Sequence, residues 1–466
     1  MNKDIEKILA DLRLTSERYA KPTRYYDGDH DLAFATQKFE NAFGTLFREF
    51  ALNLCPVICD AVRDKLKVVG FSVDSFGVSV LQSFRVGKTP NPETSVDSVH
   101  SATRKIWHTN RMDTRAGEVH KEALKNGDAY IIVWPNTRGE AVFYPNRAAN
   151  ISVSYDEDSP GLIRRAAKHW LDADKHVRLN LFYPDRIEKY ISRAKSEGAM
   201  PDAKDFVEYG VRNAERGMKT ARTKTPHSEL RTPHWVIPNP YGVVPVFHFA
   251  NNADIGQLGR SELEAAIPVQ DGLNKSVLDM LVAMEFAANR QRWAAGIEVE
   301  YDKDGKTVAP FKAGVEHLWI ANDPSARFGD FEAAQLEQFL KVKDGFRVDI
   351  ASVTGTPLHY LLQNTGGFPS GESLRKAETR FIAKVRDRQT SFGQVWADVM
   401  EFALRIEGRN TARLITEWED PAPMSEREVL ENILLKKQIG LPVEHAMLEA
   451  GYGEADVKNM VPSGIS

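Results

Sequence analysis

Cysteine is scarce in this sequence, with Cys55 and Cys59 the two examples among 466 residues. They lie four residues apart in an apolar stretch, and a metal site would need further ligands nearby, so two buried thiols in a reducing compartment are expected. The sequence also lacks a run of about 18 apolar residues, and its first residues lack the apolar core of a signal peptide. We therefore expect a cytosolic chain that does not insert into a membrane.

Motifs of the common enzyme classes are missing as well. No GxxxxGK[ST] phosphate loop, GxSxG elbow or HExxH zinc motif is present. His359 stands out because it lies in a glycine-rich stretch, but a packed or solvated histidine is a simpler interpretation than a catalytic one. The acids Asp271, Asp279 and Glu285 share one predicted helix, and we interpret them as a solvated face rather than an acid–base pair. The sequence thus predicts no catalytic centre, no metal site and no cofactor.

The sequence also lacks a surplus of basic residues. The formal net charge is −4 at pH 7, whereas a general nucleic-acid-binding protein carries a basic surplus. Mild acidity is compatible with a conduit for DNA, because a wall past which DNA slides should not hold phosphates tightly. With 466 residues the chain also exceeds a single typical core, so two or more modules are expected.

The chain is organised around the stretch 259–292. Its residues recur at steps of three and four, which is the period of an α-helix, and Ser261 and Glu264 match a capping box at its start. The members of this pattern are Ile267, Asn274, Val277, Leu278, Leu281, Met284 and Ala288. A helix of roughly 30 residues would be ~45 Å long, more than a small compact domain needs. We therefore expect it to pack against copies of itself or to act as a lining.

The region after this helix completes a predicted hairpin. A second helix at 331–350 is the natural antiparallel return of the first, with a small strand pair and a loop between them at 293–330. The connection 354–371 is punctuated by glycine and proline, which is typical of a disordered or a functional loop. Another long helix follows, capped by Ser370 or by Ser373.

On either side of this hairpin the sequence alternates between helical and strand-like patterns. A Lys- and Arg-rich stretch at 192–233 is either a solvated loop or a basic contact arm. The predicted helices are 4–19, 34–68, 96–110, 113–126 and short ones after 425, and the predicted strands are 69–73, several between 128 and 252, and one before 420. Together these patterns predict an α+β fold that is mainly α-helical.

Four segments of the chain resemble portal proteins of tailed double-stranded DNA bacteriophages, the head-to-tail connector family. Residues 259–297 look like the stem-helix segment of that family, and residues 354–400 look like its tunnel loop and the long helix that follows. NPYGVVPVFHFAN at 239–251 and YYDGDHDL at 25–32 are also similar to the family. The resemblance implies a portal-protein fold with long stem helices, an antiparallel β wing module and a small clip module.

The resemblance also implies a division of the chain into parts. These are an N-terminal segment at 1–33, a wing at 34–252 (helical at 34–127, β at 128–252, with the insertion 192–233), a first stem helix at 253–292, a clip at 293–330, a second stem helix at 331–352, a tunnel loop at 353–372, a long wing helix at 373–408 and a crown at 409–466. The stem is thus expected to be a helical hairpin that carries the clip at its tip.

In function, the resemblance implies a ring of about twelve copies with head-to-tail interfaces, located at one capsid vertex of the virion after assembly from subunits in the host cytoplasm. Double-stranded DNA would be packaged and later ejected through its channel without sequence-specific binding. The implied partners are the large terminase subunit, which would supply the ATP chemistry, head-completion or adaptor proteins, and the major capsid and scaffolding proteins.

The resemblance further indicates which residues would act. The DNA-facing tunnel loop would include His359, Gln363, Asn364, Thr365, Gly366 and Gly367. The candidates for the channel lining of the stem are Asp271, Asp279 and Glu285. The candidates for partner docking on the clip are Asp302, Lys303, Asp304, Lys306 and Trp319.

Two other functions are compatible with the sequence. A metal-dependent nucleic-acid-processing enzyme would assemble its site from scattered acids, and metal-dependent nuclease activity of the purified protein would favour it. A helical scaffold without DNA passage would be favoured by a monomer that lacks an axial hole.

Overall fold

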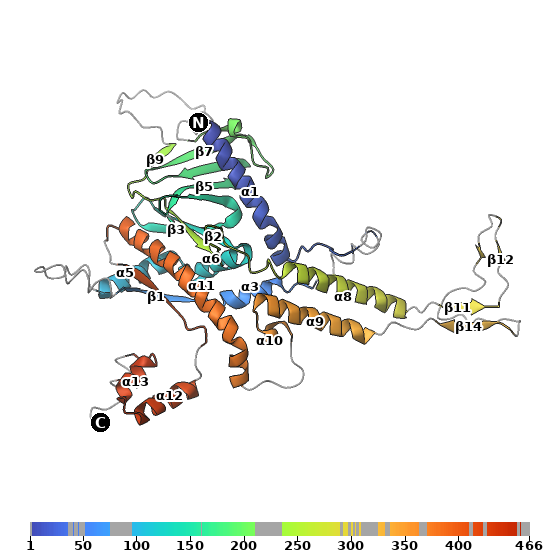
Figure 1. Ribbon diagram of the computed structural model, residues 1–466. Helices are drawn as coiled ribbons and strands as arrows, with labels where there is room; N and C mark the ends of the chain where they lie inside the picture. The colour runs from blue at the N-terminus through green and yellow to red at the C-terminus, as the bar shows by residue number, and fades with distance from the viewer. Residues whose placement is uncertain are drawn as a thin grey trace, which may run out of the picture.

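The computed structural model shows a body of helices and antiparallel sheets from which a pair of helices projects (Figure 1). It describes residues 2–35, 41, 45, 52–74, 96–159, 161–209, 235–288, 292–296, 300, 301, 303, 307, 308, 325–330, 336–362, 371–409, 413–422, 426–453 and 457. The combination of helices with antiparallel sheets confirms the predicted α+β class.

The first helix is longer than its sequence pattern predicts. The helix expected to end at Tyr19 continues as α1 (Asn2–Asp27) through Pro22, and it ends at Gly28, whose φ is 91°. A proline inside a helix costs roughly 3 kcal/mol. Burial of Tyr19 and Tyr25, on either side of the proline, offsets this cost.

Two antiparallel sheets occupy the region between residues 128 and 250. A three-stranded sheet has the order β10-β2-β3, and a six-stranded sheet has the order β4-β5-β6-β7-β8 with β9 also paired to β7. The strands are β2 (Asp128–Pro135), β3 (Ala141–Arg147), β4 (Ile151–Tyr155), β5 (Ile163–Leu171), β6 (His176–Phe182), β7 (Arg186–Lys195), β8 (Phe206–Glu208), β9 (Val236–Pro238) and β10 (Val246–Ala250), with the short helices η2 (Ala148–Asn150) and η3 (Ala203–Asp205) between them. Helix α1 packs on the six-stranded sheet, with Ile8 and Leu12 in one cluster with Leu179.

The stretch 192–233, predicted to be a loop or an arm, begins inside this sheet. Strand β8 pairs with β7, with Ile191 opposite Val207, and Ser192 is buried. The prediction is therefore wrong for the first part of the stretch, because its alternating side chains pack in the sheet. Most of its lysines and arginines fall in 210–234, which lies outside the described residues.

A set of shorter helices packs below the three-stranded sheet. These are α3 (Cys55–Arg63), α5 (Val96–Thr109) and α6 (Met112–Asn126), of which α5 and α6 confirm the predicted helices. Pro56 lies in the first turn of α3, where a missing N–H is tolerated. Cys55 and Cys59 are buried as expected, and burial raises the pKa of Cys55 to about 12. Most of the segment 34–51 lies outside the described residues.

Helices α8 (Ile267–Ala288) and α9 (Leu336–Thr354) lie side by side and extend away from the body (Figure 1). We call this pair the projecting hairpin. Both predicted helices are confirmed, and Pro268 lies in the first turn of α8, where it is tolerated.

The start of α8 differs from the capping-box prediction. Ser261 is not the N-cap of α8, because a stretch of turns separates it from the helix. Its hydroxyl accepts from the backbone N–H of Leu263 at 3.0 Å, as a cap of the first turn would, and donates to the backbone oxygen of Lys125 at 2.5 Å. Residues 262–266 form turns, and the helix begins five residues later than predicted.

Short strands follow at the far end of the projecting hairpin. Strand β11 (Arg292–Ala295) pairs with β14 (Arg327–Asp330), and β12 (Glu300–Tyr301) pairs with β13 (Thr307–Val308). A small strand module between the two helices is therefore confirmed. The predicted partner strand at 316–320 lies outside the described residues.

The long helix that follows the projecting hairpin crosses the body beneath the three-stranded sheet. Helix α11 (Gly371–Ile406) follows the short α10 (Leu358–Leu361), and Phe392 and Trp396 of α11 are fully buried. Strand β15 (Leu414–Trp418) then pairs antiparallel with β1 (Val68–Val73). That pairing places β15, the first strand after α11, in the body.

The chain continues into two short helices that lie apart from the body (Figure 1). These are α12 (Glu426–Gln438) and α13 (Val443–Glu449), and they pack against each other. We call them the C-terminal hairpin. They confirm the short helices predicted after residue 425, while the predicted capping residue Ser425 lies outside the described residues.

Helices α8 and α9 approach each other closely at Gly272. A Cβ added there would lie 2.8 Å from Cε1 of Phe346, which forces a shift in the packing. We expect Gly272→Leu to lower the free energy of unfolding by about 1–3 kcal/mol and to weaken the hydrogen-exchange protection of both helices.

Gly345→Leu in α9 is the matched control for this variant. Nothing lies within 4 Å of a Cβ added at Gly345, so this change should be neutral or stabilising, because leucine favours a helix over glycine. An equal loss of stability in both variants would contradict tight packing at Gly272.

Candidate functional site

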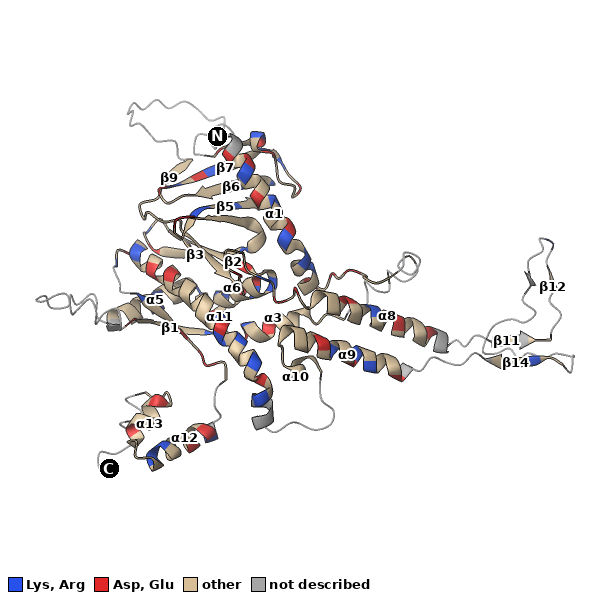
Figure 2. Cartoon of the chain, viewed as in Figure 1, with Lys and Arg blue, Asp and Glu red and all other residues tan. Residues whose placement is uncertain are grey.

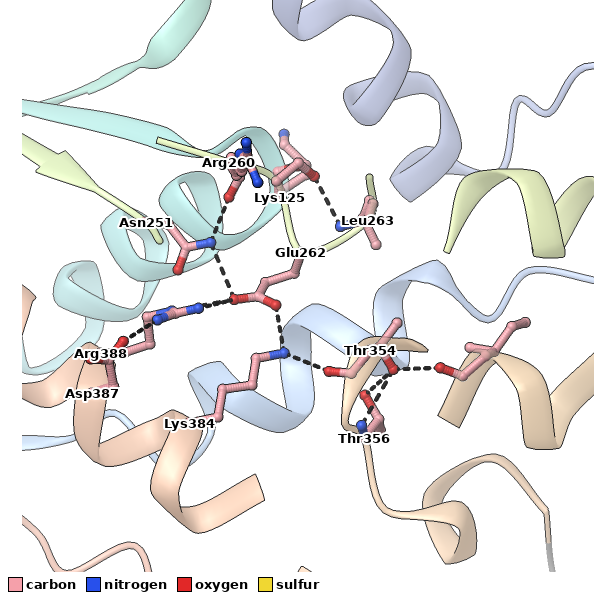
Figure 3. A network of polar contacts seen from close by, with 12 residues as sticks. Lys125, Asn251, Arg260, Glu262, Leu263, Thr354, Thr356, Lys384, Asp387 and Arg388 are labelled. Carbon is pink, nitrogen blue, oxygen red and sulfur yellow. Dashed lines mark hydrogen bonds and ion pairs between the residues drawn. The ribbon is translucent and has the colours of Figure 1, made fainter. Parts of the chain in front are cut away.

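A buried carboxylate, Glu262, lies where the projecting hairpin joins the body (Figure 3). Glu262 belongs to the loop between β10 and α8, and its side chain is 8% exposed. Its Oε2 lies 2.5 Å from Nζ of Lys384, and its Oε1 lies 3.1 Å from Nη2 of Arg388. Asn251 donates a further hydrogen bond from Nδ2 at 3.2 Å. One carboxylate thus pairs with two cations that lie one turn apart on α11, and Asp387 is a second anionic partner of Arg388.

Lys384 connects this carboxylate to the second helix of the projecting hairpin. Its Nζ also donates to the backbone oxygen of Thr354, the last residue of α9, at 2.9 Å. A cation at this position satisfies one of the terminal carbonyl groups of the helix and interacts favourably with its dipole. Figure 3 shows that Lys384 of α11 contacts both the Glu262 loop, which leads into α8, and the end of α9. We call these two segments the hairpin root.

The neighbouring charges decide the ionisation state of Glu262. Burial alone would raise the pKa of this carboxyl, but Lys384 and Arg388 outweigh burial and hold the pKa below its ordinary value of 4.5. Glu262 is therefore ionised at neutral pH. Its ion pairs contribute stability that is fully present above about pH 4.5 and is lost as the pH falls through the lowered pKa.

A second buried carboxylate, that of Asp128 at the start of β2, fixes the preceding part of the same loop. Its Oδ1 accepts a hydrogen bond from the backbone N–H of Gly259 at 2.8 Å and lies 2.6 Å from Nε2 of His248. Its Oδ2 accepts a hydrogen bond from the hydroxyl of Tyr19 at 2.6 Å. A Cβ at Gly259 would collide with the carbonyl oxygen of Gly127. Glycine is therefore required where the loop passes over the body.

The three acidic residues predicted to face a channel lie in different environments. Asp271 is buried and accepts a hydrogen bond from the hydroxyl of Tyr25 at 2.6 Å, and burial raises the pKa of Asp271 above its ordinary value. The prediction is wrong for Asp271, because this carboxylate points into the body against α1. Asp279 is paired with Lys275 at 2.5 Å, and Glu285 is exposed towards the end of α8.

His359, the histidine that stands out in the sequence, is held against α11. Its Nε2 lies 3.1 Å from Oε1 of Glu378, and the hydroxyl of Tyr360 donates to the same oxygen at 3.1 Å. The first part of the glycine-rich connection is therefore packed on α11 through α10. The residues Gln363, Asn364, Thr365, Gly366, Gly367, Asp302, Asp304, Lys306 and Trp319 lie outside the described residues, while Lys303 is exposed in a turn.

Comparison with known proteins gives the family of the chain. The profile of the family described as phage portal protein, SPP1 Gp6-like, matches residues 5–449. The chain belongs to this family of phage portal proteins. The resemblance to portal proteins, the head-to-tail connectors, is thereby confirmed.

Two curated relatives of this portal-family chain come from mycobacteriophages. The portal protein of Mycobacterium phage L5 is 28% identical over 230 residues, which cover 46% of this chain and 47% of the relative. The portal protein of Mycobacterium phage D29 is 27% identical over 230 residues, with the same shares. The chain thus matches about half the length of these curated relatives.

Similar solved structures come from gene transfer agent particles. A chain in the virion of a native particle has a TM-score of 0.44 and 12% identity, over 90% of this chain and 95% of that chain. A chain in the neck of an empty particle, computed with C6 symmetry, has a TM-score of 0.48 and 11% identity, over 93% of each chain.

Within the part of the portal-family chain that the structure describes, no helix is long and apolar enough to cross a membrane. The same part contains no group of three or more His, Cys, Asp or Glu side chains that could hold a metal ion.

Sequence patterns did not identify the network at Glu262. One signal was present on α11, where Arg388 occupies a place in the apolar stripe between Val385 and Phe392. A cation in such a stripe needs an anionic partner when it is buried. The partner itself was not predictable, because Glu262 lies 126 residues away in the sequence.

Glu262→Gln tests the charge balance of this network. The change removes the anion that Lys384 and Arg388 share in a buried site, while Arg388 keeps its pair with Asp387. We expect a loss of about 3 kcal/mol in the free energy of unfolding at pH 7, measured with urea. The difference from wild type should shrink as the pH falls below about 4.5, because protonation then removes the same charge from Glu262.

Glu264→Gln, on an exposed side chain of the same loop, is the control. It should change the free energy of unfolding by less than about 1 kcal/mol. A loss in Glu262→Gln that is independent of pH would contradict an electrostatic role for this carboxylate.

Asp271→Asn tests the burial of the predicted channel residue. The amide keeps an acceptor for the hydroxyl of Tyr25 and removes a charge whose burial raises the pKa, so the charged carboxylate is disfavoured in the folded chain. We expect a melting temperature at pH 7 equal to or above that of wild type. Any gain should vanish below pH 3.8, where the carboxyl is protonated in both the folded and the unfolded chain. A clear decrease at pH 7 would show that the ionised carboxylate stabilises the fold.

Proposed function

We propose that this portal-family chain assembles into a ring whose channel carries double-stranded DNA into the capsid during packaging and out of it during ejection. The observation that carries the proposal is the projecting hairpin, two helices that extend from the body (Figure 1). These helices expose apolar side chains. Membership of the phage portal family supports it.

The projecting hairpin exposes apolar side chains along both of its helices. They are Met284 on α8 and Leu340, Val342, Val348 and Val353 on α9, each between 42% and 48% exposed. Full burial of a side chain of this kind stabilises by roughly 1.5–3 kcal/mol. Copies of the hairpin packed side by side around an axis would cover these side chains, and a closed cyclic arrangement leaves a bore at its centre.

The charges of the same hairpin suit a wall past which DNA moves. Acidic and basic residues alternate along α8 and α9 (Figure 2), so no continuous basic stripe binds the phosphates. Asp279 and Glu285 remain the acidic candidates for the channel lining on α8, where their carboxylates would repel the DNA backbone. Such repulsion keeps the duplex mobile.

The glycine-rich connection is proposed as the tunnel loop. Polar groups of Gln363, Asn364 and Thr365 contact DNA phosphates without reading the base sequence, and Gly366 and Gly367 allow the backbone to adapt. His359 belongs to the anchored end of this loop, because its contact with Glu378 attaches α10 to α11.

The remaining parts are assigned by the proposed function. The wing comprises 34–252, α11 and β15, the stem is the projecting hairpin, the clip is 293–330 and the crown begins after residue 420.

The clip, with candidates Asp302, Lys303, Asp304, Lys306 and Trp319, docks the large terminase subunit and later the head-completion or adaptor proteins. Terminase supplies the ATP hydrolysis, and this chain contributes no catalysis of its own. Subunits assemble in the host cytoplasm with scaffolding and major capsid proteins and are then retained at one vertex of the virion.

Electron microscopy and native mass spectrometry of the purified chain test the assembly directly. We expect rings of about twelve copies with an axial hole. A protein that remains a monomer at high concentration, and also in the presence of scaffolding and capsid proteins, would contradict the proposal.

Deletion of Asn364–Gly367 tests the loop. We expect the deletion to leave ring assembly unchanged, because the described end of the connection is anchored by Glu378, and to impair packaging or retention of DNA. Both are measured as the amount of nuclease-protected DNA per particle, normalised to the number of rings. Loss of the rings themselves would show that the segment is structural, and normal DNA content would contradict a DNA-facing role.

A further inference from the structure

The C-terminal hairpin exposes apolar side chains on two separate sides. Helix α13 packs against α12, where Lys436 forms an ion pair with Glu449 at 2.5 Å and Ile433 is half-buried. Leu430, Leu434 and Leu435 of α12 are each more than half exposed, and Ile439 is 83% exposed. Among the described elements, the hairpin helices pack on each other and lie away from the body (Figure 1).

The exposed side chains fall on two flanks of α12. Leu430 and Leu434 are one turn apart, and so are Leu435 and Ile439, whose N–H continues the helix by donating to the oxygen of Leu435 at 3.2 Å. At about 100° per residue the two pairs point in directions roughly 140° apart. Ile433 points towards α13, on the side of the helix away from the shorter arc between the two pairs. The two flanks therefore lie on opposite sides of the plane that contains α12 and α13.

The two flanks differ in shape and charge. The first flank is a groove of about 690 Å³, whose apolar lining is Leu430, Ile433, Leu434 and Val443 and whose rim carries Arg427, Glu431 and Lys437. The second flank projects Leu435 and Ile439, and Glu428 lies on the same side of the helix, about two turns before Leu435. The rim carries one more positive than negative charge, and Arg427 and Glu431 form an ion pair at 2.7 Å within it. Across the hairpin, the opposite flank is an apolar projection with a carboxylate on the same side of the helix.

We propose that the occupant of the groove is the second flank of a neighbouring copy of this chain. Leu435 and Ile439 of one copy enter the groove formed by Leu430, Leu434 and Val443 of the next copy, and Glu428 faces the basic rim. A contact between two different flanks is heterologous, so each copy uses one flank on each side and the series closes into a ring when the rotation allows it. This inference rests on the proposed ring and names the surface that joins its subunits near the C-terminus.

Paired cysteines test the contact in the full-length chain. Leu434→Cys combined with Ile439→Cys places one thiol in the groove and one on the projection. These two thiols are five residues apart on opposite sides of one helix, too far for a bridge within a copy. The natural Cys55 and Cys59 are fully buried, so they contribute little background. Under oxidation of assembled rings we expect a ladder of covalent multimers that disappears on reduction.

The single variants are the controls, because each carries only one of the two thiols. Leu434→Cys alone and Ile439→Cys alone should give no multimers. Covalent dimers from one single variant would show that like flanks meet, which overturns the head-to-tail contact. A Leu434→Cys thiol that resists alkylation in the monomer would show that another segment of the same chain fills the groove, which also overturns it.

The assembly state separates this inference from the proposed function. Rings of the double variant that yield no ladder would contradict the contact and leave the ring intact. A chain that forms no rings, with or without the substitutions, would contradict both. Protection of the groove thiol only after an adaptor protein is added would overturn the contact between copies and assign the groove to that adaptor.

Discussion

The attachment of the projecting hairpin depends on an ionised carboxylate that is shielded from water. Glu262 keeps its charge because Lys384 and Arg388 lie within ion-pair distance, and those two cations are tolerated in the interior because Glu262 is there. Apolar contacts are non-directional and allow neighbouring helices to slide, whereas these ion pairs fix atoms to within ångströms. The position of α11 relative to both ends of the hairpin root is therefore set by charge.

Close backbone contact complements this network at the same root. The backbone N–H of Asn251 reaches the oxygen of Gly127 at 2.7 Å, and a side chain at Gly259 would block the approach. Asp128 then accepts from the N–H of Gly259, so the loop is held on one side by a carboxylate of β2 and on the other by cations of α11. Two buried acids thus position a loop that has no regular secondary structure of its own.

Local sequence patterns predicted the elements of this fold better than their partners. Helices such as α6 and α11 are long and periodic enough for burial and local preference to agree. The error at Asp271 occurs because a contact distant in sequence sets its environment, the hydrogen bond from Tyr25, 246 residues earlier. An acid on a predicted helix appears solvated until the helix that covers it is known. The ion pairs of Glu262 were unpredictable for the same reason, although a cation in the stripe of α11 indicated that a buried partner was needed.

The distribution of buried charge and exposed apolar surface has a consequence for assembly. The body and the hairpin root combine buried ion pairs with an extensive apolar core, whereas the projecting hairpin and the C-terminal hairpin expose side chains such as Leu340 and Ile439. In the proposed ring these exposed surfaces would meet neighbouring copies of the chain, and the gain on burial would come from the apolar side chains. Because the root is fixed within each chain, that gain would not require the network at Glu262 to rearrange. The orientation of the projecting hairpin would then be a property of the single subunit. The angle of the hairpins in a ring would be set within each chain by the ion pairs of Glu262, and not by contacts between neighbours.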